Sequence, residues 1–235
     1  MSLFFEENLI SLAKSLEKPL YAVGGVVRNY LIDGSISEDV DLASATTAEC
    51  LREKLIEFGY AVLAEYKRTG TVVFTDGKTK YEFPTFRTDN YFGGEHKPNH
   101  VEYTESIEKD ALRRDFSCNA VYMNVATGEL VDPLKSGVSD IKKRRLNTVT
   151  DADKVFAFDG LRLLRLARFA GELNFKPTEE VMASALKFAK NIKEISPERI
   201  YAELKKILVA DKKYPFSDKS GHYTALKILD DARVL

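Results

Sequence analysis

The sequence has few of the residues that build covalent or metal-bound scaffolds. Its two cysteines, Cys50 and Cys118, lie far apart, and its three histidines are His96, His100 and His222. Two cysteines without a metal-like spacing exclude a disulfide scaffold and favour a reducing compartment. The three histidines support neither a zinc site nor a Ser-His-Asp triad.

Long apolar runs and an excess of charge of one sign are also absent. No apolar run approaches the roughly 18 residues of a membrane-spanning helix, and the N-terminus has no signal-peptide pattern. With 35 Lys and Arg against 36 Asp and Glu, the formal net charge is −1. No overall field attracts nucleic acid, so any such contact needs a local basic patch. We therefore expect a cytoplasmic protein that does not contact a membrane.

The pattern of the chain changes near residue 149. Before it, helical and strand patterns mix around a single sheet, including a predicted hairpin over 70–87 that turns at Asp76-Gly77. Paired glycine, proline and asparagine predict a mobile loop over 88–105. After residue 149 no strand alternation remains, and residues 150–235 predict a helical second domain.

Two acids share one face of a predicted strand. In "DVDLAS", Asp39 and Asp41 alternate with Val40 and Leu42, which point the other way, toward a core. Paired carboxylates suit Mg²⁺, which one or two acids hold together with water and substrate phosphates. A polar strand end explains the same pattern without a metal, but the glycine–arginine turn nearby favours the metal site. Glu82 in "YEFPTFR" is the candidate third carboxylate, with an exposed strand glutamate as the alternative.

The neighbouring turn is "YAVGGVVRNYL", in which Gly24 and Gly25 separate a short apolar strand from a helix. Backbone N–H groups can approach a phosphate where Cβ atoms are missing, and the helix N-terminus adds partial positive charge. Arg28, one turn into the helix, can then bind phosphate oxygens. A tight turn with a positive φ explains one glycine, but neither the second glycine nor the arginine. The stretch predicts a triphosphate site that faces a metal site.

One continuous helix is predicted over 153–175, "DKVFAFDGLRLLRLARFAGELNF". In it Asp159, Arg162, Arg165 and Arg168 recur every three residues and form one slowly turning ridge. The apolar residues between them indicate an enclosed helix whose arginines need partners. An Asp and an Arg one turn apart offer an acceptor and donors that match the edges of cytosine and adenine. The alternative is an intrahelical Asp159–Arg162 pair with solvated arginines.

Three segments occur in this order: "VGGVVRNYL…EDVDLAS", "RRDFSCNAVYMNVATGELVDPLKSGVSDIKKRRLNTV" and "FDGLRLLRLARFAGELNF". Together they resemble the class II tRNA nucleotidyltransferase and bacterial poly(A) polymerase family, over roughly residues 20–210. The resemblance implies an α+β fold, with a polymerase-β-like nucleotidyltransferase head and a mixed sheet over 1–149 and an all-helical neck over 150–235. It implies addition of C, C and A to tRNA 3′ ends from CTP and ATP, without a nucleic-acid template.

The same resemblance implies roles for residues of this sequence. Asp39 and Asp41 would bind the catalytic Mg²⁺, and Arg28 would contact the triphosphate together with the turn of Gly24 and Gly25. Further nucleotide contacts would come from two other segments: Arg114 and Asp115 near phosphate and ribose, Asp159 and Arg162 at the incoming base, and Arg165 and Arg168 beside them.

Three departures from the family pattern are visible. Phe158 stands where the family usually has Glu before the base-reading Asp, and Asn29 stands where it usually has Asp after the arginine of the first motif. The family also commonly continues into body and tail domains that hold tRNA, whereas this chain stops after "TALKILDDARVL". We therefore expect either a head-and-neck fragment or an unusually compact protein.

Several functions stay open at this stage. Within the class, the alternatives to CCA addition are a poly(A) polymerase and an enzyme that adds only CC or only A. Outside the class, the alternative is a non-catalytic nucleotide- or RNA-binding module on the same fold. A binding module need not keep Asp39 and Asp41 together, and this sequence has both. The oligomeric state has no signal in the sequence.

Overall fold

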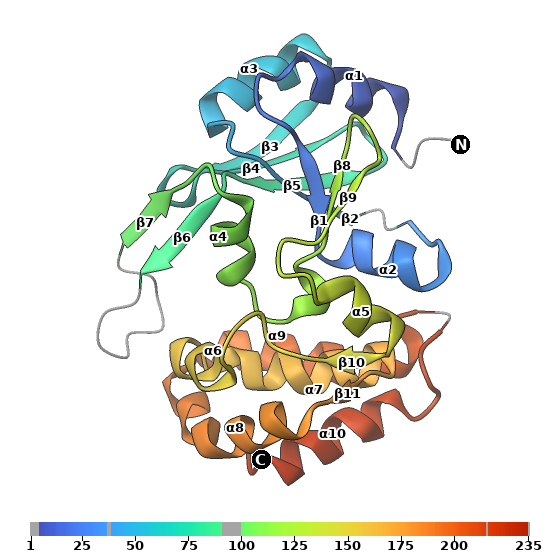
Figure 1. Cartoon of the computed structure of the whole chain (residues 1–235), viewed down its shortest axis with the longest axis vertical. Helices are drawn as coiled ribbons and strands as arrows, with labels where there is room; N and C mark the ends of the chain where they lie inside the picture. The colour runs from blue at the N-terminus through green and yellow to red at the C-terminus, as the bar shows by residue number, and fades with distance from the viewer. Residues whose placement is uncertain (1–4, 37–38, 91–99, 215, 235) are drawn as a thin grey trace. The chain divides into compact units, whose positions relative to one another are not determined.

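The computed structural model describes residues 5–36, 39–90, 100–214 and 216–234. They form two compact units (Figure 1). Unit 1 contains the described residues of 1–90, 100–114 and 118–138, and unit 2 contains those of 115–117 and 139–235. The domain limits 1–149 and 150–235 stay a prediction. In the part of the chain that the structure describes, no helix is long and apolar enough to cross a membrane.

Unit 1 is built on a seven-stranded sheet of order β3-β4-β5-β2-β1-β8-β9. The sheet is mixed because β2 runs parallel to β5, whereas the other neighbours pair antiparallel. This confirms the predicted α+β class with a mixed sheet. The strands are β1 (Tyr21–Val23), β2 (Asp39–Ala43), β3 (Ala61–Tyr66), β4 (Thr71–Thr75), β5 (Lys80–Pro84), β8 (Tyr122–Asn124) and β9 (Leu130–Val131).

Two helices of unit 1, α3 and α4, begin at a residue whose side chain caps them. The side chains of Thr47 and Ser106 accept hydrogen bonds from the first turns of α3 and α4. Gly34 ends α2 in the left-handed conformation. α1 and α3 lie together against one side of the sheet (Figure 1). The α-helices that lie wholly within the described residues of unit 1 are α1 (Glu7–Ser15), α2 (Gly25–Asp33), α3 (Ala48–Glu57) and α4 (Ile107–Leu112).

The hairpin predicted over 70–87 is confirmed, and the loop predicted over 88–105 is wrong at both ends. β4 and β5 pair antiparallel, and Gly77 in their turn has a φ of +95°. β6 (Arg87–Asn90) and β7 (His100–Tyr103) pair with one another as a separate two-stranded sheet. The rest of the predicted loop lies outside the described residues. Long-range pairing of two short polar segments leaves no periodic signal in the sequence.

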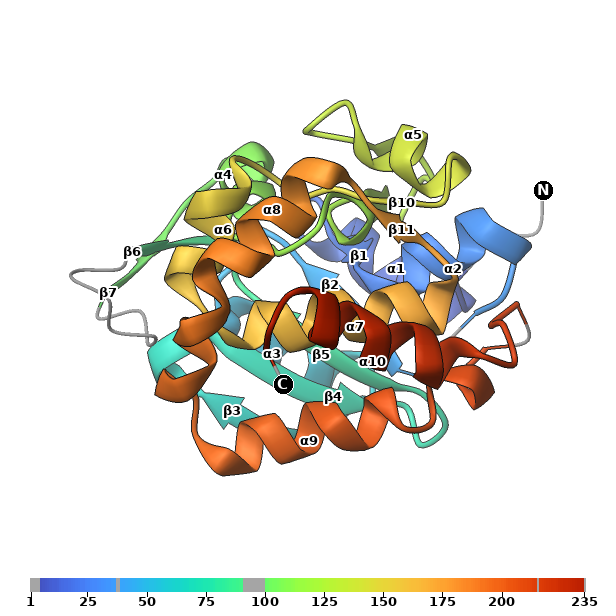
Figure 2. The ribbon, with the colours of Figure 1, turned by 90° about the horizontal axis from the view of Figure 1, so that it is seen from below.

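Unit 2 is mainly helical, as predicted. α7 is the central helix, and α9 and α10 pack against it (Figure 2). The expected absence of strands is wrong in one place, because β10 (Arg145–Leu146) pairs in parallel with β11 (Lys176–Pro177). The helices are α6 (Ala152–Phe158), α7 (Leu161–Leu173), α8 (Glu179–Phe188), α9 (Pro197–Ile207) and α10 (Gly221–Asp231), and α5 (Gly137–Lys142) contains the boundary between the units.

The helix predicted over 153–175 is interrupted at Asp159 and Gly160. Asp159 has extended dihedral angles, and α7 begins only after Gly160. A Cβ atom on Gly160 would lie 2.3 Å from the backbone oxygen of Asn191. The break therefore allows two backbone segments to approach closely, which helical periodicity alone could not show.

A similar close approach joins α7 to α10. A Cβ atom on Gly171 would lie 2.3 Å from the backbone oxygen of Gly221, and both glycines belong to helices. Gly-to-Ala in a helix interior usually stabilises, but here the methyl group must displace backbone. We expect Gly171→Ala to destabilise unit 2 by about 1–3 kcal/mol through overpacking. Urea unfolding measures this, and Ala202→Gly at an exposed position of α9 calibrates helix propensity. An equally or more stable Gly171→Ala variant would contradict the close crossing.

Candidate functional site

The glycine turn of unit 1 lies against the paired carboxylates. Gly24 has a φ of +76°, and a Cβ atom on it would lie 3.1 Å from Oδ2 of Asp41. The two residues meet because β1 and β2 are neighbours, with Ala22 opposite Leu42. The backbone conformation therefore favours glycine here, and a Cβ atom would also crowd the carboxylate beside it. This contact explains why the two motifs occur so close together in the sequence.

Arg28 lies beneath this turn, and its side chain is only 2% exposed. Its Nε and Nη2 atoms donate to Oδ1 of Asn29 at 3.1 and 2.9 Å, and its Nη1 donates to Oδ1 of Asn119 at 2.5 Å. Its Nη2 atom would lie 3.6 Å from a Cβ on Gly25. The guanidinium thus places positive charge beside the start of α2, held by amide oxygens. A direct contact between Arg28 and phosphate stays a prediction.

The strand pattern of the acids is confirmed. Asp39 and Asp41 are exposed on β2, and Val40 and Leu42 between them are buried. Glu82 lies opposite Asp41 in the parallel pairing of β2 with β5, so it shares the face of the two aspartates. The same face of the sheet therefore carries three carboxylates on two neighbouring strands.

These carboxylates form an open arrangement. Among the residues that the structure describes, no group of three His, Cys, Asp or Glu side chains converges closely enough to hold a metal ion alone. An all-oxygen pair with a third carboxylate beside it nonetheless fits a hard divalent cation, because Mg²⁺ keeps several waters and takes substrate phosphates as further ligands. The residues present therefore suit a cation that binds together with a nucleoside triphosphate.

The segment 113–115, the RRD motif, contains two predicted site residues. The first of these two, Arg114, belongs to a buried cluster around Asp110. Oδ2 of Asp110 accepts from Nη2 of Arg114 at 3.1 Å and from Oη of Tyr122 at 2.7 Å, and Oδ1 accepts from Nε of Arg113 at 2.7 Å. Nε of Arg114 also donates to Oη of Tyr122 at 3.0 Å. Arg114 is thus fixed by groups of its own unit rather than extended into solvent.

The two arginines keep the buried Asp110 carboxyl ionised in spite of its burial. Burial raises the pKa of Asp110, but the guanidinium groups of Arg114 and Arg113 lower it more, so that it falls to about 2. Burial also raises the pKa of Tyr122, and the Asp110 carboxylate adds to this. Asp110 therefore stays ionised and accepts hydrogen bonds throughout the neutral pH range.

In unit 2, Asp115 and Arg165 pair with each other. Oδ2 of Asp115 accepts from Nε of Arg165 at 2.7 Å and lies 2.6 Å from its Nη2. Oδ1 of Asp115 accepts from the N–H of Phe116. Burial lowers the pKa of Arg165, but the Asp115 carboxylate raises it more. Two guanidinium nitrogens on one carboxylate oxygen thus tie the end of the RRD motif to α7.

Arg168 also has partners within unit 2. Its Nε atom donates to Oε2 of Glu203 at 2.6 Å, and its Nη1 atom donates to Oε2 of Glu172 at 3.0 Å. All three side chains are buried. Burial raises the pKa of Glu203, but Arg168, Arg165 and Lys206 together lower it below its ordinary value. The expectation that the arginines of this helix need partners is confirmed, and solvated arginines are wrong for Arg162 and Arg168.

The two predicted base-reading residues lie at the start of α7. Oδ1 of Asp159 accepts from the N–H of Leu161 at 3.0 Å, and Oδ2 accepts from Nη2 of Arg199 at 3.2 Å. Nη1 of Arg162 donates to the carbonyl oxygen of Val155 at 3.2 Å. Asp159 precedes the helix instead of sharing its ridge with the arginines. Base recognition by this pair stays a prediction.

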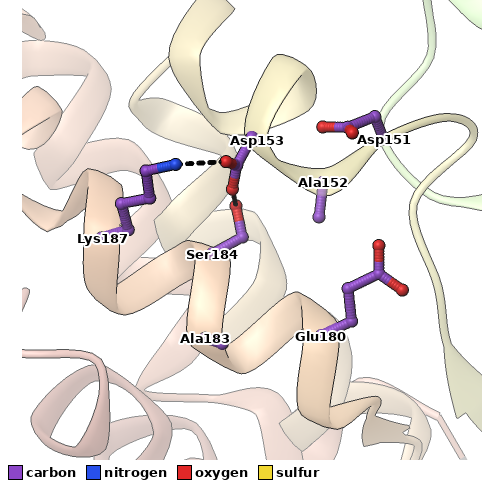
Figure 3. A pocket seen from close by; sticks show the side chains of 7 residues that line it. All are labelled: Asp151, Ala152, Asp153, Glu180, Ala183, Ser184 and Lys187. Carbon is purple, nitrogen blue, oxygen red and sulfur yellow. Dashed lines mark hydrogen bonds and ion pairs between the residues drawn. The ribbon is translucent and has the colours of Figure 1, made fainter.

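An acidic hollow of about 310 Å³ lies between α6 and α8 (Figure 3). Asp151, Asp153 and Glu180 contribute carboxylates to its wall. Asp153 accepts from Ser184 and forms an ion pair with Lys187. None of the predicted site residues lines it. Asp153 is thus already bonded to side chains of α8, and the hollow adds nothing to the candidate site.

The sequence interpretation missed the residues that hold the predicted ones in place. Asp110, Asn119, Arg199 and Glu203 each bond to a candidate site residue. Of these four, only Asp110 had a local signal, because it lies four residues before Arg114, a spacing at which side chains can pair. The other three are distant in the sequence from the side chains that they contact.

Comparison with known proteins identifies the chain. Residues 20–147, more than half of it, match the family model described as the poly A polymerase head domain. This chain belongs to that family. Residues 174–218 match a second model, described as the probable RNA and SrmB-binding site of polymerase A. The poly A polymerase head thus covers the glycine turn, the carboxylates and the RRD motif.

Relatives of this head-domain protein include CCA-adding enzymes. The enzyme of Geobacillus kaustophilus is 38% identical over 191 residues, which cover 80% of this chain and 45% of the relative. The enzyme of Leuconostoc mesenteroides is 34% identical over 195 residues, which cover 82% and 46%. The chain therefore spans about half the length of these relatives.

Solved structures of the same kind have the same fold. The Bacillus stearothermophilus CCA-adding enzyme in complex with CTP aligns with a TM-score of 0.80 at 29% identity, over 98% of this chain and 53% of that one. A tRNA nucleotidyltransferase complexed with a primer tRNA and an incoming ATP analog aligns with a TM-score of 0.77 at 28% identity, over 97% and 61%. These alignments confirm the predicted fold class.

Proposed function

We propose that this chain is a template-independent nucleotidyltransferase that adds C, C and A to the 3′ end of tRNA from CTP and ATP. The observation that carries the proposal is the contact between the Gly24 turn and Asp41 in a poly A polymerase head. Relatives named CCA-adding enzymes, and aligned structures named for CTP and for tRNA with an ATP analog, support this substrate choice. The reaction takes place in the cytoplasm, in agreement with the cysteine content and the lack of long apolar runs.

The chemistry requires that charge on the triphosphate be neutralised and positioned. Asp39 and Asp41 would hold Mg²⁺, with Glu82 as the adjacent third carboxylate. When bound, the ion favours attack of the RNA 3′-hydroxyl on the α-phosphate and stabilises the pyrophosphate leaving group. The backbone N–H groups at Gly24 and Gly25 would bind phosphate oxygens. Arg28 beneath them adds positive charge to the same place.

The remaining predicted residues divide into two roles. Asp159 and Arg162 would present an acceptor and donors to the base, with Arg199 holding the Asp159 carboxylate. Arg114, Asp115, Arg165 and Arg168 are engaged by protein partners. We propose that these four mainly fix the backbone near the nucleotide, and that direct nucleotide contacts by them are secondary.

The direct test is incorporation. The 235-residue chain is incubated with Mg²⁺, tRNA that lacks its 3′-terminal CCA, and labelled CTP or ATP. Addition of two C and then one A supports the proposal. Long A tails would assign a poly(A) polymerase, and addition of C alone or A alone would assign a partial enzyme. Nucleotide binding without incorporation would assign a non-catalytic module.

Base selection tests Asp159 separately. We expect Asp159→Ala to lose about 1–3 kcal/mol of discrimination between CTP or ATP and their GTP and UTP competitors, because a paired hydrogen-bond contact is lost. The measurement is kcat/KM for all four nucleotides. Arg199→Gln should cause a smaller loss of discrimination, because the Asp159 carboxylate is still present but no longer held by the Arg199 guanidinium. Unchanged selectivity in Asp159→Ala would show that this residue does not read the base.

A further inference from the structure

One side of α9 and the turn after it is exposed and carries both apolar and basic side chains. We call it the α9 face: its apolar and basic members are Tyr201, Ala202, Lys205, Leu208, Val209 and Lys212, and the exposed Glu198 lies one turn before Tyr201 and Ala202 on the same side. Tyr201 is 64% exposed and Leu208 is 61% exposed. The opposite side of α9 packs into the core of unit 2 through Ile200, Leu204 and Ile207. The α9 face therefore has no packing role that would explain its large side chains.

The α9 face lies in a basic stretch of unit 2. Residues 187–213 contain eight lysines and arginines and four acids, in a chain whose net charge is −1. One of those acids, Glu203, is buried and bonded to Arg168. Lys205 and Lys212 form no ion pair with any residue that the structure describes. Local positive charge of this kind attracts a polyanion even where the whole protein is neutral.

Tyr201 and Lys205 already form a pair. The Nζ atom of Lys205 lies 5.4 Å from the centre of the Tyr201 ring, one helical turn away. An exposed aromatic ring beside a cation is the arrangement that stacks an unpaired base while its phosphate is neutralised. Lysine is depleted in the cores of protein–protein interfaces, so the composition of this face favours nucleic acid over a protein partner.

We propose that the α9 face binds a single-stranded segment of the RNA substrate, with a base stacked on Tyr201 and phosphates beside Lys205 and Lys212. The proposal rests on the proposed function for its choice of RNA. Residues 174–218 match the model of a probable RNA-binding site, and the proposal assigns RNA contacts to one side of a single helix within that region. It also places RNA contacts within this chain, independent of any further domain.

The test measures RNA binding without nucleotides. Fluorescence anisotropy of 5′-labelled tRNA lacking its CCA end gives Kd at several salt concentrations. We expect Tyr201→Ala to raise Kd about tenfold or more, because stacking on one residue is lost, whereas Tyr201→Phe keeps wild-type affinity. Lys205→Gln with Lys212→Gln should reduce the slope of log K against log salt by about 1.4, at roughly 0.7 per phosphate contact of a single strand.

Two control variants test whether losing any exposed tyrosine or lysine would weaken RNA binding in the same way. Tyr223→Ala removes an equally exposed tyrosine from α10, and Lys14→Gln removes an exposed lysine from α1 of unit 1. Both should leave Kd and the salt slope unchanged. Circular dichroism melting confirms that each variant is folded, which is expected because every substituted side chain is exposed.

The outcomes separate this proposal from the proposed function. If RNA binding depends on Tyr201 but no nucleotide is incorporated, RNA binding by the α9 face is supported and the proposed enzymatic activity is overturned. Normal incorporation with unchanged Kd in the α9 variants would overturn the α9 face alone. Undetectable RNA binding by the wild-type chain would also overturn it. Loss of self-association in Tyr201→Ala, with RNA affinity unchanged, would reassign the face to a protein partner.

Discussion

Replacing Asp41 by Asn is expected to abolish nucleotide incorporation while the fold stays intact. The carboxylate lies at the Gly24 turn on an exposed strand face, so its loss removes a ligand charge without opening the core. Stabilisation of transition-state charge by a bound metal amounts to several kcal/mol, which corresponds to a loss of about 10²–10³-fold or more in kcat. Single-turnover incorporation of CTP at saturating Mg²⁺ measures it.

Two further variants make this result specific. Glu65→Gln on the edge strand β3 is the same chemical change at another strand glutamate, and it should leave incorporation unchanged. Glu82→Gln should reduce incorporation if the third carboxylate takes part, and leave it unchanged if Glu82 is only an exposed strand residue. Full activity in Asp41→Asn with normal thermal melting would remove the metal assignment.

Replacing Arg168 by Met is expected to destabilise unit 2 by about 3–5 kcal/mol. The substitution leaves the buried carboxylates of Glu172 and Glu203 without their guanidinium partner. The melting temperature should fall by roughly 6–20 °C for a chain of this size. Lys187→Met, which breaks an exposed ion pair with Asp153, should cost less than about 1 kcal/mol.

The pH dependence tests the cause of this loss. In the wild type the pKa of Glu203 lies below its ordinary value of 4.5, so its stabilising contribution is present above that value and is lost as the pH falls through the folded pKa. Without Arg168 the pKa of Glu203 rises, because only Arg165 and Lys206 then oppose the effect of burial, and the variant loses much of the stability that this carboxylate contributes near neutral pH. The difference in melting temperature should therefore be larger at pH 7 than at pH 5.

A variant that repairs the charge completes the experiment. Glu203→Gln and Glu172→Gln, added to Arg168→Met, remove the carboxylates that lost their guanidinium partner and should recover part of the lost stability. If Arg168 instead contacts the nucleotide, Arg168→Met would raise KM for CTP at a nearly unchanged melting temperature. That result would restore the nucleotide contact implied by the family resemblance.

Local sequence patterns determined the parts of the site that depend on periodicity and on backbone conformation. Alternation in "DVDLAS" placed Asp39 and Asp41 on one exposed face, because side chains of a strand alternate between its two sides. The glycine pair predicted a turn between a strand and a helix, and Gly24 has the positive φ that favours glycine. The hairpin turn at Asp76-Gly77 followed from the same local preferences.

Only the tertiary structure decided which of these parts meet. Glu82 lies beside Asp41 because β5 runs parallel to β2, a register fixed by long-range pairing. Arg165 meets Asp115 across 50 positions, and the pairing depends on how α7 packs within unit 2. At the break before α7, Gly160 admits the backbone at Asn191, which lies 31 positions further along the chain. Periodicity reports which face of an element is apolar, but the partner of a buried charge is set by which elements pack together, and no local pattern encodes that choice.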